Sequence, residues 1–144
     1  MMKRSLLTAL LAFAAIFGGT TLAQQASVPA AKADGKTGTV VFFRAKRFVG
    51  AVEGMKIVEG DVELGRLRNG TYFTIQATPG KHQYAAHSIK KDLLTLEVDP
   101  GETYYMLGNI TTGGPNLAPS DQATFEAIKA ELKDLTGQGS DKKN

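Results

Sequence analysis

Four side chains are candidates for ligand binding by their type and spacing: Arg44, Phe48, Arg66 and Tyr72. Arg44 and Phe48 belong to a stretch that interleaves cations with aromatic rings, and the arginine pair Arg66 and Arg68 precedes Tyr72. A basic patch with aromatic rings can bind a polyanion or a sugar. The alternative interpretation is that arginines at strand ends keep a sheet edge soluble. The sequence leaves both interpretations open.

Three carboxylates alternate along the chain, at Glu59, Asp61 and Glu63. On one extended strand they would share a face and resemble a site for a hard cation. Gly60-Asp61 is instead typical of a turn, which would spread the three carboxylates apart. We therefore predict a solvated hairpin tip here and no metal site.

Catalytic residues are not evident in this sequence. The two histidines, His82 and His87, are five residues apart, so on a regular strand they point to opposite faces. The sequence has no nucleophile elbow, zinc-protease motif, phosphate-binding loop or dinucleotide fingerprint, and the absence of cysteine excludes thiol catalysis. A hydrolase using Glu59, Asp61 or His87 is the weakest hypothesis. We predict no catalytic residue and no cofactor.

The elements that must position these residues are short strands separated by turns. Alternation of apolar and polar residues predicts seven strands, at residues 39–44, 55–58, 62–67, 71–77, 82–88, 93–98 and 103–110. Asn69-Gly70 is a strong hairpin signal, and Pro79-Gly80 and Pro100-Gly101 fit type II turns. This pattern predicts a mainly β fold: an antiparallel β-sandwich or partly open barrel of about seven strands with one C-terminal helix.

A helix is expected over residues 120–136, after a Gly/Pro-rich loop over residues 111–119. Ser120 is a suitable N-cap and Gly137 a suitable stop. Apolar residues at helical spacing form a single stripe between them: Phe125, Ile128, Leu132 and Leu135. Such a stripe usually covers a face or an open end of the sheet, and a partner-binding helix is the alternative.

The first 23 residues have the three parts of a secretory signal peptide. Lys3 and Arg4 form the positive region, an apolar core follows, and small residues precede a cleavage site after Ala23. An uncleaved anchor is the alternative, but the apolar core is shorter than the roughly 20 residues that a membrane span needs. We therefore predict export to the periplasm or the extracellular space, with no stable membrane span after cleavage.

Cleavage changes the charge balance of the 144-residue chain. Loss of Lys3 and Arg4 lowers the formal net charge from +3 to +1, so the composition gives no footprint of a nucleic-acid partner. Without cysteine there is no residue to carry a lipid, and we expect no lipoprotein. The remainder is expected to be a flexible leader over residues 24–37, one domain over residues 38–137 and a disordered tail over residues 138–144.

Five segments within residues 38–110 carry a resemblance to a known family. They are Val41-Phe42-Phe43-Arg44, Leu64-Gly65-Arg66-Leu67, Gly70-Thr71-Tyr72-Phe73, Pro79-Gly80-Lys81-His82 and Pro100-Gly101-Glu102-Thr103-Tyr104-Tyr105. With these segments the chain resembles a bacterial family known only as domain of unknown function 2846. The resemblance implies an exported, envelope-associated β-sandwich with no established reaction, and it supplies no catalytic residues.

The first functional hypothesis is a non-enzymatic binding or structural module of the cell envelope, whose partner is an envelope protein or polymer. The alternative is a small-ligand or glycan binder that uses Arg44, Phe48, Arg66 and Tyr72. These hypotheses differ in whether the candidate side chains meet at one site.

Overall fold

The computed structural model of the protein describes residues 36–138. The predicted signal peptide, the leader up to residue 35 and the tail from residue 139 lie outside the described residues. The expectations for those segments therefore stay predictions.

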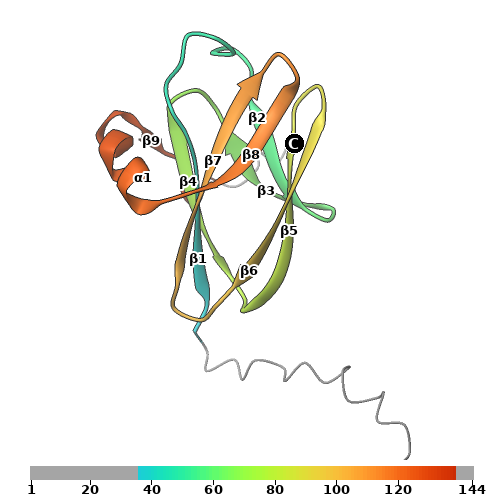
Figure 1. Ribbon diagram of the computed structural model, residues 1–144, viewed down its shortest axis with the longest axis vertical. Coiled ribbons are helices and arrows are strands. Elements are labelled where there is room, and N and C mark those ends of the chain that lie inside the picture. Colours follow the sequence, from blue (N-terminus) through green and yellow to red (C-terminus); the bar gives the residue numbers. More distant parts are fainter. Residues whose placement is uncertain (1–35, 139–144) are drawn as a thin grey trace, which may run out of the picture. The chain divides into compact units, whose positions relative to one another are not determined.

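Two β-sheets face each other and form an open sandwich (Figure 1). The five-stranded sheet, which we call sheet A, has the order β8 (Gly114–Ser120), β7 (Thr103–Thr111), β1 (Gly38–Arg44), β4 (Thr71–Ala77) and β9 (Lys133–Asp134). The four-stranded sheet, sheet B, has the order β3 (Val62–Leu67), β2 (Met55–Glu59), β5 (Gly80–His87) and β6 (Lys91–Val98). The predicted β-sandwich with a C-terminal helix is confirmed.

Strand β1 carries apolar side chains on both faces of sheet A, so both faces must be covered. Val40 and Phe42 point between the sheets, where Phe42 stacks on Phe73 with ring centroids 5.2 Å apart. Val41 and Phe43 point to the outer face and are equally buried, because the C-terminal segment packs over them. Apolar residues at both parities of β1 thus match a central strand that is covered on both faces.

The last strand that the sequence predicts is followed by a strand, β8, and not by the expected loop over residues 111–119. β7 and β8 form an antiparallel hairpin through Thr112-Gly113. β8 contains Pro115 and Pro119, and it tolerates them because it lies at the edge of sheet A. With β8 and the short β9, nine strands are found over residues 36–138 instead of seven.

The strand-pairing expectations need two corrections. Asn69-Gly70 does not close a hairpin: β3 lies in sheet B and β4 in sheet A, so this turn carries the chain between sheets. Pro79-Gly80 and Pro100-Gly101 also lead from one sheet to the other. The pairing is not wholly antiparallel, because β1 pairs with β7 and β4 with β9 in parallel.

The helix is much shorter than the predicted 120–136. Helix α1 spans Gln122–Ile128, a 3₁₀ turn follows at Lys129–Glu131, and the chain then forms β9. The N-cap is Asp121 and not Ser120, since the Asp121 carboxylate accepts a hydrogen bond of 2.7 Å from the Thr124 amide. Gly137 has the positive φ of 76° expected of a stop, but it follows β9 and does not end the helix.

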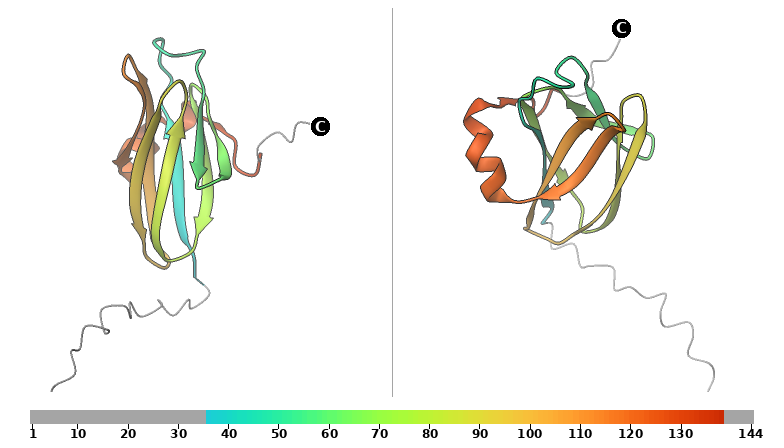
Figure 2. Two further views of the ribbon diagram at one scale, coloured as in Figure 1. Left: turned by 90° about the vertical axis from the view of Figure 1, so that its right-hand side faces the viewer. Right: turned by 45° about the horizontal axis from the view of Figure 1, so that its top comes forward.

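The apolar stripe nevertheless packs against the sheets, with Phe125 buried and Ile128, Leu132 and Leu135 partly buried. Phe125, Ile128 and Leu132 pack on the outer face of sheet A, while Leu135 reaches the core between the sheets. Figures 1 and 2 show α1 beside sheet A, away from sheet B. This confirms the interpretation that the stripe covers the protein's own sheet.

Candidate binding surface

Four connections gather at one end of the sandwich, which we call the loop end: the β1–β2 loop 45–54 and the turns 68–70, 88–90 and 112–113. β1 ends there, and its parallel partner β7 runs on in the same direction to Thr111, while the β2–β5 pairing places Lys56 opposite His87. Figure 1 shows the loop 45–54 in teal at the top, with the orange 112–113 turn and, beyond it, the yellow 88–90 turn at the same end.

Arg44 fixes the conformation of the loop 45–54. Its side chain is buried, and its two terminal nitrogens, Nη1 and Nη2, donate 2.5 Å hydrogen bonds to the carbonyl oxygens of Glu53 and Gly50. Burial lowers the pKa of Arg44 and the charge of Glu53 opposes this shift, but a guanidinium stays protonated in proteins. The positive charge of Arg44 therefore interacts with carbonyl oxygens of its own chain and does not face the solvent.

Further contacts join the loop 45–54 to the neighbouring turns. The Arg47 amide donates a 2.7 Å hydrogen bond to Asn69 Oδ1. Gly50 lies so close to Ile110 that an added Cβ would be 3.0 Å from the Ile110 Cβ. The turn 88–90 also lies against the start of β8, because a Cβ on Gly114 would be 3.0 Å from the Lys90 Cβ. The loop end is thus a connected surface.

Large apolar side chains project from the loop end into solvent. Phe48 and Val52 are each 98% exposed, Ile89 is 84% exposed and Val49 is 75% exposed. Scattered exposed apolar residues are ordinary, but four at one end, on two adjoining connections, form a candidate contact surface.

Basic side chains form a row across the outer face of sheet B next to the loop end. Lys56 on β2 lies directly opposite Arg66 on β3 and His87 on β5, and His87 lies opposite Lys91 on β6. Directly opposite residues in a sheet share a face, so the row is continuous across four strands. Lys46, Arg47, Arg68 and Lys90 add exposed cations at the loop end itself.

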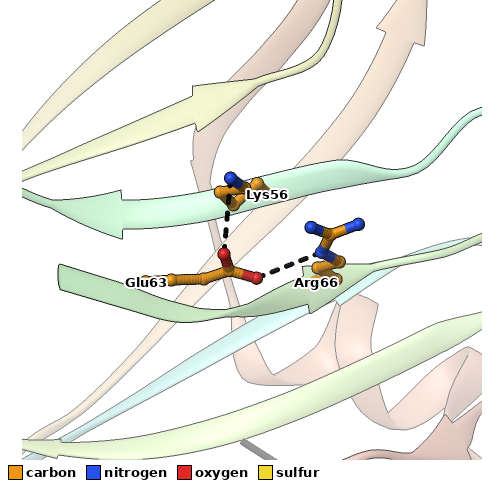
Figure 3. Close-up of polar contacts among 3 residues, drawn as sticks. All are labelled: Lys56, Glu63 and Arg66. Carbon is orange, nitrogen blue, oxygen red and sulfur yellow. Dashed lines mark hydrogen bonds and ion pairs between the residues drawn. The ribbon is translucent and has the colours of Figure 1, made fainter. Parts of the chain in front are cut away.

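A β-bulge arranges one acidic residue within this row. The pairing of β2 with β3 shifts between Ile57 and Val58, which leaves Leu64 as the extra residue. Glu63 and Arg66 thereby face the same side, and the Glu63 carboxylate lies between Lys56 Nζ at 3.4 Å and Arg66 Nε at 3.1 Å (Figure 3). Partial burial opposes ionisation of Glu63, but these two cations outweigh it, so its pKa lies below the ordinary value.

A polar hollow of about 720 Å³ lies between the loop 45–54 and the outer face of sheet B. Its walls are residues 51–56 together with Arg66, Arg68, His87 and Ser88. A second hollow of about 600 Å³ opens where β3 and β4 diverge, and residues of the C-terminal segment such as Lys133 and Leu135 line it. Arg66 and Arg68 border both hollows, so they lie where the two surfaces meet.

The charges of residues 36–138 are unevenly distributed although acidic and basic side chains are equally many. Most cations lie at the loop end or in the row on sheet B. Five acidic side chains lie at the end opposite the loop end: Glu59 and Asp61 around the β2–β3 turn, and Glu97, Asp99 and Glu102 around the β6–β7 turn. The sandwich therefore has a basic end and an acidic end.

The four predicted ligand-binding residues do not form one site. Phe48 and Arg66 lie on the loop-end side of the molecule, exposed to solvent. Arg44 is buried and holds the loop, so it is not available to a ligand. Tyr72 lies on the outer face of sheet A, where its ring packs on Phe125 with centroids 5.1 Å apart.

The carboxylates and histidines of the hydrolase hypothesis are also kept apart. Glu59 pairs with His82 Nδ1 at 2.5 Å on the inward side of sheet B, whereas His87 lies on the outer side beside Lys56. Asp61 is in the β2–β3 turn. Over residues 36–138, no three His, Asp or Glu side chains are grouped so that they could hold a metal ion.

Some residues of the loop end escaped sequence reasoning. Val52, Ile89, Lys90 and Lys91 stand in segments that read as ordinary loop or strand start. Val52 shares the loop 45–54 with Phe48, whereas Ile89, Lys90 and Lys91 come to the same end of the molecule only through the pairing of β5 with β2 and β6, which has no local sequence signal. The charge run around Lys46 and Arg47 was the one visible indication.

Taken together, fold and surface define a two-sheet β-sandwich with a basic, apolar-tipped loop end. A family model described as "Protein of unknown function (DUF2846)" matches residues 34–121, well over half of the chain. The chain belongs to this family. The match spans β1 to β8, while α1 and β9 lie beyond it. No curated protein matches the chain.

No helix within residues 36–138 has the length and apolar character needed to cross a membrane.

Proposed function

We propose that this chain is an exported, non-enzymatic binding module of the cell envelope, and that the loop end is its binding surface for an anionic partner. The signal-peptide pattern of residues 1–23 supports export. The observation that carries the binding role is the concentration of exposed apolar side chains and free cations at one end of a domain whose acidic and basic side chains are equally many over residues 36–138.

Charge separation favours an oriented encounter with an anionic surface. The basic end is attracted and the acidic end repelled, so the domain would arrive with the loop end forward. Arg44 contributes by fixing the loop 45–54 before contact, which reduces the ordering cost on binding.

The glycan-binding alternative has less support from the geometry. It used Tyr72 and Phe48 together with the arginines, but Tyr72 lies under α1 on the other sheet, which leaves Phe48 as the one aromatic ring of the four candidates at the loop end. The hollow beside Arg66 is lined mainly by polar and charged side chains. That lining suits anionic groups better than it suits stacking on a sugar face.

The proposal is tested by sedimenting the exported chain with isolated envelope fragments. We expect binding at low ionic strength and release as salt is raised, because exposed charges are screened within about 10 Å at 0.1 M salt. The variant Arg47→Glu/Lys90→Glu should bind at least about tenfold more weakly, a loss of roughly 1.4 kcal/mol. Its matched control, Lys36→Glu/Lys81→Glu, has the same net charge and should bind like the wild type. Equal loss in both variants, or no binding by the wild type, would contradict the proposal.

A further inference from the structure

We propose that the partner of the loop end is an anionic phospholipid bilayer, and that Phe48, Val49, Val52 and Ile89 enter its interface while the surrounding cations contact the headgroups. This inference rests on the proposed function and names the partner of the same surface.

The apolar side chains have the geometry of insertion points. Phe48 and Val52, at 98% exposure, are covered by almost nothing from the protein itself. They stand at separate positions of the loop 45–54, and Ile89 stands on the neighbouring turn. Side chains that project singly can each be surrounded by lipid, which adapts its shape to them.

The cations are placed where headgroup phosphates would lie. Lys46 and Arg47 immediately precede Phe48, and Lys90 and Lys91 immediately follow Ile89. All four are exposed, and none of them has an ion-pair partner among residues 36–138. Basic side chains beside interfacial apolar residues strengthen binding to an anionic leaflet.

A protein partner fits this surface less well. The centre of a protein interface is a contiguous, well-packed apolar patch depleted of charge. At the loop end the space behind the apolar tips is the polar hollow, walled by Glu53, Lys56, Arg66 and His87. The four apolar side chains project beyond the charged hollow. This order matches that of a bilayer, in which the hydrocarbon lies beyond the charged headgroups.

The loop is held in place before any contact. Arg44 binds Gly50 and Glu53 on either side of Val52, and Asn69 binds the Arg47 amide just before Phe48. Insertion therefore needs no folding of the loop 45–54. The hydrogen bonds from Arg44 and to Asn69 keep its apolar side chains exposed to water before contact. Because folding leaves these side chains in water, transferring them into the bilayer contributes a favourable free energy to binding.

The test uses the fact that the chain contains no tryptophan. The single substitution Phe48→Trp is mixed with vesicles of phosphatidylglycerol and phosphatidylcholine, and with vesicles of phosphatidylcholine alone. We expect a blue shift of the emission and quenching by brominated lipid chains with the anionic vesicles only. Glu102→Trp, on the β6–β7 turn at the acidic end, should show neither effect.

A second pair of variants separates insertion from adsorption. Phe48→Ser/Val52→Ser should lower co-sedimentation with anionic vesicles at least about tenfold, whereas Val62→Ser, which removes another exposed apolar side chain from the start of β3, should leave it unchanged. Equal binding of anionic vesicles by the wild type and both variants would overturn insertion. Failure to bind anionic vesicles while envelope fragments are still bound overturns the bilayer and leaves a protein or polymer partner. Failure with both overturns the proposed function as well.

Discussion

The guanidinium of Arg44 and the carbonyl oxygen of Gly50 are joined by a 2.5 Å hydrogen bond that connects the last residue of β1 to the middle of the following loop. Through this bond and its companion to Glu53, a buried charge determines the shape of an exposed surface. Arg44, which the sequence suggests as a ligand contact, is thus buried and instead fixes the loop that forms the surface.

Arg44→Lys should destabilise the protein and loosen the loop. A lysine ammonium is a point charge and cannot reproduce the fork that meets both carbonyl oxygens. We expect a loss of about 2 kcal/mol in the free energy of unfolding, measured by urea denaturation. Faster amide hydrogen exchange should be confined to residues 45–54, and binding to envelope fragments should weaken because the loop must be ordered on contact. Wild-type exchange in this loop would show that Arg44 does not hold it.

Gly65→Ala should destabilise the sandwich by about 1–3 kcal/mol through overpacking. A Cβ at position 65 would be 2.9 Å from Cζ of Phe73, a core residue of the facing sheet. Thermal or urea unfolding measures the loss. Gly54→Ala is the matched control, since its nearest contact would be 3.7 Å away. The double variant Gly65→Ala/Phe73→Leu should recover part of the loss; an unaltered Gly65→Ala protein would refute the close packing.

Phe125→Ala should cost about 3 kcal/mol while leaving the loop end intact. The Phe125 ring packs on Phe43, Tyr72 and Tyr105 and is the one buried residue of α1. Urea unfolding should show the loss, and sedimentation with envelope fragments under folding conditions should be unchanged. Loss of binding by a folded Phe125→Ala protein would mean that α1, and not only the loop end, contacts the partner.

His82 should make stability depend on pH. Its ring nitrogens bind Glu59 Oε1 at 2.5 Å and the Thr78 carbonyl at 2.7 Å. Burial lowers the pKa of His82, but the bonds to Thr78 and Glu59 outweigh this and raise it above the ordinary 6.5. Protonated His82 therefore stabilises the fold fully below about pH 6.5, and this contribution is lost as the pH rises through the higher folded-state pKa.

The pH effect can be isolated by substitution. His82→Gln should be more destabilised relative to the wild type at about pH 6 than at about pH 9, as measured by urea unfolding. Glu59→Gln should weaken the same pH dependence, since it removes the negative partner. A His82→Gln penalty that is constant across this range would contradict the ion pair.

The strands were predictable because their alternation is local, whereas their partners were not. Gly70 has the positive φ of 66° that its turn signal implies, but a turn dipeptide does not specify which sheet receives the next strand. β8 was missed because Pro115 and Pro119 are strong breakers in sequence and harmless at a sheet edge.

The end of the helix and the composition of the surface were unpredictable for a similar reason. Leu132 and Leu135 continue the helical spacing of Phe125 and Ile128. The helix nevertheless ends at Ile128, and the pairing of β4 with β9 places the two leucines against the sheets. Likewise, Ile89 and Lys90 join Phe48 only through the pairing of distant strands.

The direct test of the binding surface is to find which end of the domain meets the envelope. Because the chain contains no cysteine, Thr112→Cys at the loop end and Glu102→Cys at the acidic end can each carry one environment-sensitive fluorophore. With isolated envelope fragments, the label at position 112 should report a less polar surrounding, and the label at position 102 should remain in water. A response at position 102 alone, or an equal response at both positions, would contradict a loop end that binds the envelope.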